Sequence, residues 1–584
     1  MADTPLEAPV EPGPPPRSRW HLALILLAAL VPALPWLVDL PHFGALQYND
    51  YYGIVAQVLD DGHFSADPMR WLLLKSNEHT VTIPALLYAA NFALTNGDNR
   101  TLSLLAIVFA ILCALLAGSM IRRGCGAGPW LQAGATFVAS ALWFTPAAAH
   151  SYVLGFSGTI WITANLLTVW AMWRLVRVRR DDRARAVLPV IVIGALGALT
   201  YTTNLSLWPA LLLGAVLLGL DRRKIALLAF GTALVFLMQW LLRHHPEGHP
   251  ALNSSLGPVV EFTGAYLAWP FTGEVAVARF AGLFGMAVVF VALVWLLLVR
   301  DRGQTRAAAP FLMLAIYGLG NAIGTAVGRS AWGIHAAPAS RYVSLAMSFW
   351  LGVLGLGAWL ALRVLARRRE GGDALRPVRI GVVLAAATLM LSTWIFGQQE
   401  RLDYAERAAW NPLAALALRD RVLTDTEVLA KVNSDPGQFL AVPWLETLGH
   451  IPFDGPTTLL RGARPDPELL QPAPDPRVAG HLDALQPVGE GVVRVKAWAA
   501  ARVGELAEAL VLDETGAVRG ELVFGSPRED VAEQWQAGWR WSGLRGYAFA
   551  GTEPARLRIY TRLVGERTWS PLVGELVLAA GSPR

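Results

Sequence analysis

The sequence predicts a polytopic α-helical membrane protein with a β-rich domain at its C-terminal end. Of its 584 residues, 54% are hydrophobic and only 16% are charged, and the mean hydropathy is +0.41. This is more apolar surface than one soluble core can bury. Apolar runs in lipid must be helical, because each backbone polar group has to be paired within its own segment. About eleven spans are predicted, at 20–38, 101–121, 129–149, 155–173, 187–202, 205–220, 225–242, 280–299, 308–327, 342–362 and 380–396.

Basic residues between these spans predict the orientation. Short cytoplasmic loops retain Lys and Arg, and with eleven spans the basic clusters, such as Arg122-Arg123 and Arg222-Arg223-Lys224, all fall on one side. The proline-rich residues 1–19 are then a disordered cytoplasmic tail. Residues 20–397 form the membrane domain, whose first outer loop is 39–100. The excess basic charge lies in the membrane part of the chain, where anchoring on the cytoplasmic side accounts for it. Nucleic acid is therefore not an expected partner.

Residues 80–94 are apolar but short. A span here would move every later loop to the opposite side of the membrane and place its basic residues outside. The sequence therefore favours a helix lying at the outer membrane interface. The alternative is a short true span, with one further span elsewhere in the chain.

The character of the chain changes after Phe396. Residues 398–424 are charged and predict a helical connector, and 425–584 show strand alternation, as in Val492 to Trp498. A small extracytoplasmic β-sandwich is expected. Its segments Gly525 to Val531 and Gly538 to Gly543 would either face carbohydrate or belong to the sandwich core. Cys113 and Cys125 lie in a span and in a cytoplasmic loop, so no disulfide is expected.

The first outer loop carries acidic and aromatic residues. Asp50 follows the first span and is flanked by Tyr48, Tyr51 and Tyr52. A sugar joined to a polyprenyl phosphate already has a good leaving group, so its transfer needs chiefly a base that takes the proton of the attacking hydroxyl. Asp50 is the candidate base, and the three tyrosines are candidate lining of a sugar site. Alternatively, Asp50 caps the helix that follows it.

Further polar groups are expected on the same face. Glu78 and His79 would orient the acceptor, tune the base or bind a divalent ion, or else form a solvated loop end. Arg329 and Arg341, with His335, lie in a short outer loop where arginine is disfavoured, and guanidinium groups bind phosphate bidentately. Their alternative role is interfacial anchoring. The cluster from Arg243 to His249 is a weaker metal candidate.

The order of these motifs resembles the GT-C superfamily of membrane glycosyltransferases, and is particularly similar to protein O-mannosyltransferases and lipid A aminoarabinose transferases. The matching motifs cover about the first 125 residues: Asp50 and Ala56, then Asn77-Glu78-His79 with Pro84, Leu86 and Tyr88, then Gly97-Asp98-Asn99-Arg100. The resemblance implies a GT-C-like membrane domain, an inverting transfer from a polyprenyl-phosphate sugar, and the role of base for Asp50. Asn49-Asp50 replaces the common acidic pair, which leaves metal use open.

The expected partners are a polyprenyl-phosphate sugar, the lipid bilayer, and a glycan, lipid or protein acceptor. The sequence identifies no certain cofactor, and a divalent metal stays open. Arginine greatly outnumbers lysine, which is typical of a GC-rich bacterial genome, so the expected location is a bacterial inner membrane. Two other classes stay open: a glycolipid transporter or flippase, disfavoured by few polar residues inside the spans, and a membrane-anchored glycan-binding or assembly protein.

Overall fold

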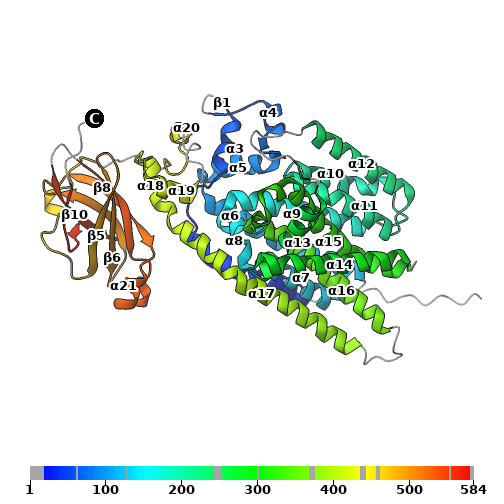
Figure 1. Cartoon of the computed structure of the whole chain (residues 1–584). Coiled ribbons are helices and arrows are strands. Elements are labelled where there is room, and N and C mark those ends of the chain that lie inside the picture. Colours follow the sequence, from blue (N-terminus) through cyan, green and yellow to red (C-terminus); the bar gives the residue numbers. More distant parts are fainter. Residues whose placement is uncertain are drawn as a thin grey trace, which may run out of the picture.

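A helical body and a β-rich domain lie next to each other, connected by the long helix α17 (Leu375–Ala409) (Figure 1). The computed structural model describes residues 19–578 apart from 61–62, 126–127, 243–251, 254, 299–300, 367–374, 434–441, 455–460 and 551–553. Residues 1–18 of the predicted tail and the histidine cluster at 243–249 therefore lie outside the described residues.

The helical body confirms the predicted membrane protein. Among the described residues, seven helical segments are long and apolar enough to cross a membrane, or eight if one bent pair counts as a span. The body contains α1 (Arg19–Leu30), α2 (Leu34–Asp39), α6 (Asn99–Cys125), α7 (Pro129–Trp143), α8 (Ala149–Val153), α9 (Gly155–Arg177), α10 (Leu188–Ala198), α11 (Leu207–Leu217), α12 (Arg222–Leu241), α13 (Leu256–Ala268), α14 (Val275–Leu298), α15 (Arg302–Arg329) and α16 (Val343–Ala366).

Four of the predicted spans are shorter or bent in the structure. The bent pair is Pro146–Val153 with Gly155–Arg177, at an angle of 110°. Helices α7, α10 and α11 have only 15, 11 and 11 residues. The run of polar residues from Thr200 to Ser206 explains the break between α10 and α11, since hydroxyl and amide side chains compete for backbone hydrogen bonds.

Helix α5 (Thr82–Thr95) has 14 residues. At 1.5 Å per residue it is about 21 Å long, which is less than the bilayer core. Its length fits the predicted interfacial helix. The rest of the first loop consists of α3 (Tyr51–Gln57), α4 (Pro68–Leu72) and two short hairpins, β1 (Leu59–Asp60) with β2 (His63–Phe64) and β3 (Lys75–Ser76) with β4 (His79–Thr80).

The connector differs from its predicted bounds. Helix α17 continues without a break from the last span to Ala409, because the charged residues after Phe396 are good helix formers. The helices α18 (Asn411–Arg419), α19 (Thr426–Val432) and α20 (Val442–Thr447) follow. The strands of the β-rich domain begin only at Val478, so its first part is helical.

The strands form one antiparallel sheet. Its order is β11-β10-β7-β8-β9-β6-β5, with β12 paired to β10. An isolated bridge joins His481 on β5 to Val573, between β11 and β12, so the sheet curls until its two edges approach. This curled single sheet replaces the predicted two-layer sandwich. The strands are β5 (Val478–Gly489), β6 (Val492–Ala501), β7 (Leu506–Asp513), β8 (Val518–Ser526), β9 (Gly543–Phe549), β10 (Ala555–Leu563), β11 (Ser570–Pro571) and β12 (Leu576–Leu578).

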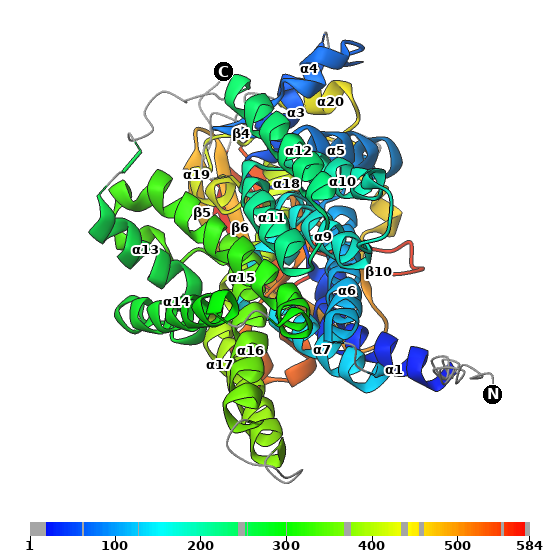
Figure 2. The same ribbon diagram turned by 90° about the vertical axis from the view of Figure 1, so that its right-hand side faces the viewer.

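Contacts from the connector fix the first loop. Figure 2 shows α20 beside α3 and α5, and the backbone N–H of Ile451 donates to the carbonyl of Asn96 at 3.0 Å. Arg407 donates to Oδ1 of Asn49 at 3.0 Å. The β-rich domain is joined to the connector through Arg494, which forms an ion pair with Asp425. The residue beside Asp50 is therefore held by a segment more than 300 positions away.

Candidate functional site

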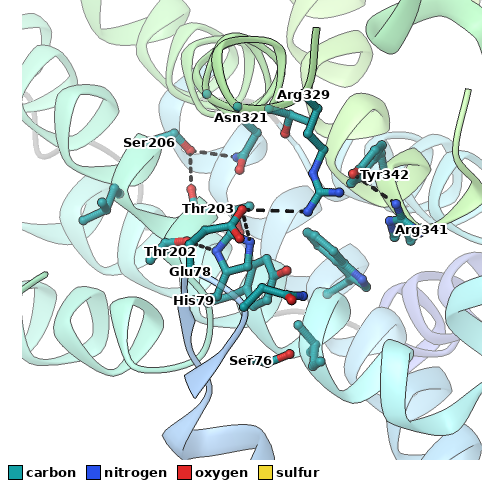
Figure 3. Close-up of a pocket in the computed structure, with 18 of the residues that line it drawn as sticks. Ser76, Glu78, His79, Thr202, Thr203, Ser206, Asn321, Arg329, Arg341 and Tyr342 are labelled. Carbon is teal, nitrogen blue, oxygen red and sulfur yellow. Dashed lines mark hydrogen bonds and ion pairs between the residues drawn. The ribbon is translucent and has the colours of Figure 1, made fainter. Parts of the chain in front are cut away.

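A cavity of about 680 Å³ lies where the first loop meets the segments between α10 and α11 and between α15 and α16 (Figure 3). Five of the residues singled out in the sequence line it: Asp50, Glu78, His79, Arg329 and Arg341. They come from three regions that are far apart in the chain. The cavity wall combines polar groups with apolar ones from α9, α11 and α12, as in ligand sites that hold a substrate with polar and apolar parts.

Asp50 stands at the start of α3. It occupies the N-cap position, yet its side chain makes no capping hydrogen bond. The preceding residue, Asn49, has φ +43, a left-handed conformation that Asn tolerates better than most residues. Since the carboxylate satisfies no helix N–H, it remains available to the cavity.

The electrostatic surroundings of Asp50 suit a base. The side chain keeps accessible surface where it borders the cavity, but nearby protein atoms partly desolvate the carboxyl. This burial raises the pKa of Asp50 above its ordinary value, and the positive charges of Arg341 and Arg329 counteract part of the rise. A raised pKa makes the carboxylate a stronger proton acceptor.

Glu78 and His79 lie at the tip of a hairpin. Asn77 and Glu78 form the two-residue turn between β3 and β4, and Asn77 has φ +51, as such turns require. Oε1 of Glu78 lies 3.2 Å from Nε2 of His79 and 3.8 Å from Nη2 of Arg329. Burial raises the pKa of Glu78, but the hydrogen bond and charge of His79 and the charge of Arg329 lower it to about 2. Glu78 is therefore an anchor for its cationic neighbours.

The ring of His79 is fixed from two further sides. Its Nδ1 contacts the hydroxyl of Thr202 (Figure 3), and its ring lies 3.8 Å from that of Tyr201. Tyr201 in turn packs on Trp161, which contacts Tyr342 edge to face at 5.7 Å. This row of aromatic rings connects the hairpin of the first loop to the start of α16.

The two arginines differ in their partners. Arg329 lies over the ring of Trp332 at 4.9 Å and is close to Glu78. Arg341 lies over the ring of Tyr342 at 4.9 Å. Within the part of the chain that the structure describes, no carboxylate lies within ion-pair distance of Arg341. A partly buried cation without a counter-ion favours an anionic ligand.

Arg341 is positioned by the elbow between α8 and α9. The hydroxyl of its neighbour Ser340 donates to the carbonyl of Ala147 at 2.5 Å and accepts from the backbone N–H of His150 at 3.2 Å. The elbow is held by Asn99, whose Oδ1 accepts from the N–H of Gly155 at 2.7 Å. Asn99 is the first residue of α6 and belongs to the motif Gly97-Asp98-Asn99-Arg100. It thus helps to shape the site without lining it.

Four predicted residues lie outside the cavity lining. Tyr48, Tyr51 and Tyr52 are at most 1% exposed and belong to the hydrophobic core beneath the loop. They do not border this cavity, because the loop packs on the connector, where the hydroxyl of Tyr51 contacts the ring of His450. Their role in lining a sugar site stays a prediction. His335 is exposed and is likewise absent from the lining.

Other lining residues were not singled out in the sequence. Tyr201 and Thr202 stand at the end of the predicted span 187–202, and Thr203 lies just beyond it. His150 follows the predicted span 129–149, and Ser157 lies within the predicted span 155–173. Nδ1 of His150 is 2.7 Å from the hydroxyl of Ser157. One sequence signal could have found them: the run of polar residues from Thr200 to Ser206 is unusual beside membrane helices.

The use of a metal ion stays a prediction for this site. Across the described ranges, no group of three or more His, Cys, Asp and Glu side chains converges as a set of metal ligands. One oxygen of Glu78 already faces His79 and Arg329. The chemistry considered below uses no metal ion.

Comparisons with known proteins give one structural likeness. No known protein family matches the chain, and no curated protein matches it. Among solved structures, it is similar to ArnT from Cupriavidus metallidurans, whose crystal structure has bound undecaprenyl phosphate. The two share 14% sequence identity with a TM-score of 0.35, over 74% of this chain and 78% of that one.

Proposed function

We propose that this chain is a membrane glycosyltransferase that moves a sugar from a polyprenyl-phosphate donor to an acceptor hydroxyl on the extracytoplasmic side. The observation that carries the proposal is the convergence, in one cavity, of Asp50 with Arg329 and Arg341. A carboxylate of raised pKa beside two guanidinium groups suits a reaction in which a proton is taken up and a phosphate departs.

In the proposed reaction, Asp50 accepts the proton of the acceptor hydroxyl as its oxygen attacks the anomeric carbon. The bond from that carbon to the phosphate oxygen breaks, and the electron pair leaves with the polyprenyl phosphate. Arg341, which has no carboxylate partner among the described residues, would bind the phosphate oxygens. Arg329, held beside Glu78, would contribute a second positive charge. Attack opposite the leaving group inverts the anomeric configuration.

Apolar side chains in the cavity wall support a lipid-linked donor. Phe236 and Leu252 line the cavity and are 44% and 70% exposed. Exposed apolar side chains at a cavity that also holds arginines suit a molecule with a charged head and an apolar chain. The nature of the sugar and of the acceptor is left to experiment.

The test is a transfer assay with the full-length protein in lipid nanodiscs and a panel of polyprenyl-phosphate sugars. We expect turnover with at least one donor, and a loss of at least roughly 100-fold in Asp50→Asn. Asp60→Asn is the matched control, because Asp60 lies in the same loop but pairs with Arg70 at the surface. Equal turnover in Asp50→Asn and the wild type would exclude Asp50 as the base. Failure of the whole panel, with normal folding, would count against the transferase.

A further inference from the structure

The outer face of strands β6 and β9 carries a second polar groove. On β6, Val495 and Ala497 face the core of the β-rich domain, so the intervening Lys496 points away from it, as alternation along a strand requires. On β9, Leu544 lies in the same core, and Arg545 follows it on the outer face. The groove beside these residues has a volume of about 520 Å³.

Two cations oppose each other in this groove. Lys496 and Arg545 are direct cross-strand partners in the register of β6 and β9. Like charges in that position repel and destabilise a sheet. Of the residues that the structure describes, none forms an ion pair with either side chain, and the buried Nη1 of Arg545 has no hydrogen-bond partner. The guanidinium of Arg545 lies 3.8 Å from the ring centroid of Trp410, which fixes it in place.

The acidic residues of the groove already have a partner. Asp483 and Asp530 both pair with Arg528, at 2.6 and 2.7 Å. They line the same groove as Lys496 and Arg545, yet neither pairs with these two cations within the described ranges. Glu406 and Glu427 attract Arg545 from beyond ion-pair distance, while Arg494 and Arg528 repel it. Among the described residues the close repulsion between Lys496 and Arg545 is thus not relieved by an ion pair, a local conflict of the kind that natural sequences retain at functional sites.

The segment between β8 and β9, next to the groove, contacts the end of a candidate membrane span. The insertion between β8 and β9 contains α21 (Glu529–Gln534) and ends near Trp541. The ring of Trp541 stacks on His42 at 6.3 Å with an angle of 9° between the planes, and His42 is the last residue of the first candidate membrane span. Trp535 and Trp541 are 53% and 49% exposed. Tryptophan favours the membrane–water interface, at the depth of lipid headgroups.

We propose that this groove is an anion site that binds a phosphate group through Lys496 and Arg545. The source expected from the position of Trp541 is the headgroup of an anionic phospholipid in the adjacent leaflet; free phosphate has the same chemistry. A bound phosphate would lie between the two cations and convert their repulsion into two charge-assisted contacts. This role is independent of the transfer chemistry proposed above.

The first experiment measures thermal unfolding of the full-length protein in detergent during a titration with inorganic phosphate at constant ionic strength. A ligand that binds the folded state raises the unfolding temperature. Lys496→Glu replaces the repelling pair by a cross-strand ion pair with Arg545. We expect this variant to unfold at a higher temperature than the wild type without phosphate, and to lose the phosphate response of the groove. Arg556→Gln, which removes from another strand an exposed arginine that pairs with Glu575, is the control and should respond as the wild type does.

The cavity arginines also attract phosphate, but the wild type and Lys496→Glu share them, so the difference between the two proteins isolates the groove. The second experiment counts phosphatidylglycerol molecules retained by each protein in native mass spectrometry. If the wild type and Lys496→Glu differ with phosphatidylglycerol alone, the groove is a lipid site. If they differ with both probes, the groove is a general phosphate site. We expect at least roughly tenfold weaker binding in Lys496→Glu. The proposal is overturned if the variant matches the wild type with both probes, or if it unfolds at a lower temperature without phosphate.

Discussion

The side chain of Asn411 pairs with both backbone groups of Leu46, across 365 positions of the chain. Its Oδ1 accepts from the N–H of Leu46 at 3.0 Å, and its Nδ2 donates to the carbonyl of Leu46 at 2.8 Å. Asn411 is 1% exposed. Asn411, the first residue of α18, thereby pairs with the backbone of Leu46 as a neighbouring β-strand would. This pairing holds the segment that leads to Asp50 in place.

Removing this amide should loosen the loop. Asn411→Ala leaves a buried N–H and a buried C=O of Leu46 without partners, which we expect to lower the free energy of unfolding by about 2 to 4 kcal/mol. Transfer activity should fall as well, because the segment before Asp50 loses its support. Thermal unfolding and turnover in nanodiscs measure the two effects. Gln57→Ala, which removes an exposed amide from α3, should change neither by much; an Asn411→Ala protein as stable as this control would contradict the prediction.

Gly97 tests the contact between the first loop and the connector. Gly97 has φ +80, and a Cβ there would lie 2.1 Å from Nε2 of His450, the ring that accepts from the hydroxyl of Tyr51 at 3.1 Å. Gly97→Ala should therefore destabilise by more than the roughly 1 kcal/mol expected from a left-handed alanine alone. Gly462→Ala is the matched control, since Gly462 has the same φ of +80 and open space around it. If both variants lost the same stability, the ring of His450 would move aside for the new methyl group without lowering the free energy of unfolding, and the prediction would be wrong.

Asp50 should control the pH dependence of activity. Its carboxylate must be ionised to accept a proton, and because its pKa is raised, turnover should fall as the pH drops through a value above 3.8, the ordinary pKa of aspartate. Glu78, with a pKa of about 2, stays ionised throughout that range. In Glu78→Gln the rate should drop while the acidic limb of the pH profile keeps its position. A shift of the limb in this variant would assign it to another group.

The same raised pKa has an effect on stability. A carboxyl whose pKa is higher in the folded than in the unfolded state contributes stability below its unfolded pKa and loses it as the pH rises through the folded value. Asp50→Asn removes that charge, so we expect the variant to unfold at a higher temperature than the wild type at neutral pH, although it is inactive. Unfolding scans across the acidic and neutral range measure this difference. A less stable Asp50→Asn protein at neutral pH would show that the carboxylate is structural.

Arg341 should act on the donor. Arg341→Gln removes the guanidinium that lacks a carboxylate partner among the described residues, and we expect at least roughly tenfold weaker binding of the polyprenyl-phosphate donor. Arg341→Lys keeps the charge but not the bidentate geometry, so its affinity for the donor should lie between those of the wild type and Arg341→Gln. Donor titrations of each variant test this order. Arg279→Gln, at the surface of α14 next to Glu261, should bind donor as the wild type does.

Much of the architecture was predictable because it depends on local chemistry. Long apolar runs such as that of α6 identify membrane helices wherever they pack, and strand alternation such as that of β6 identifies a β-rich domain. The hydroxyl-rich segment between α10 and α11 shows the limit of this approach. Its helices look like two full spans by composition, but their length depends on where the polar residues find hydrogen-bond partners.

The sequence by itself determined that this is a membrane protein with a β-rich C-terminal domain, and it picked out the charged residues that line the cavity. Hydropathy and charge are properties of single residues and short segments, so they need no tertiary information. Only the tertiary structure decided that Asp50, Glu78 and Arg341 share one cavity, that Tyr51 lies in the core, and that Lys496 opposes Arg545. These relationships depend on contacts between separate segments, from the paired strands β6 and β9 to Tyr51 and His450, which are 399 positions apart, and no local pattern carries a signal for them.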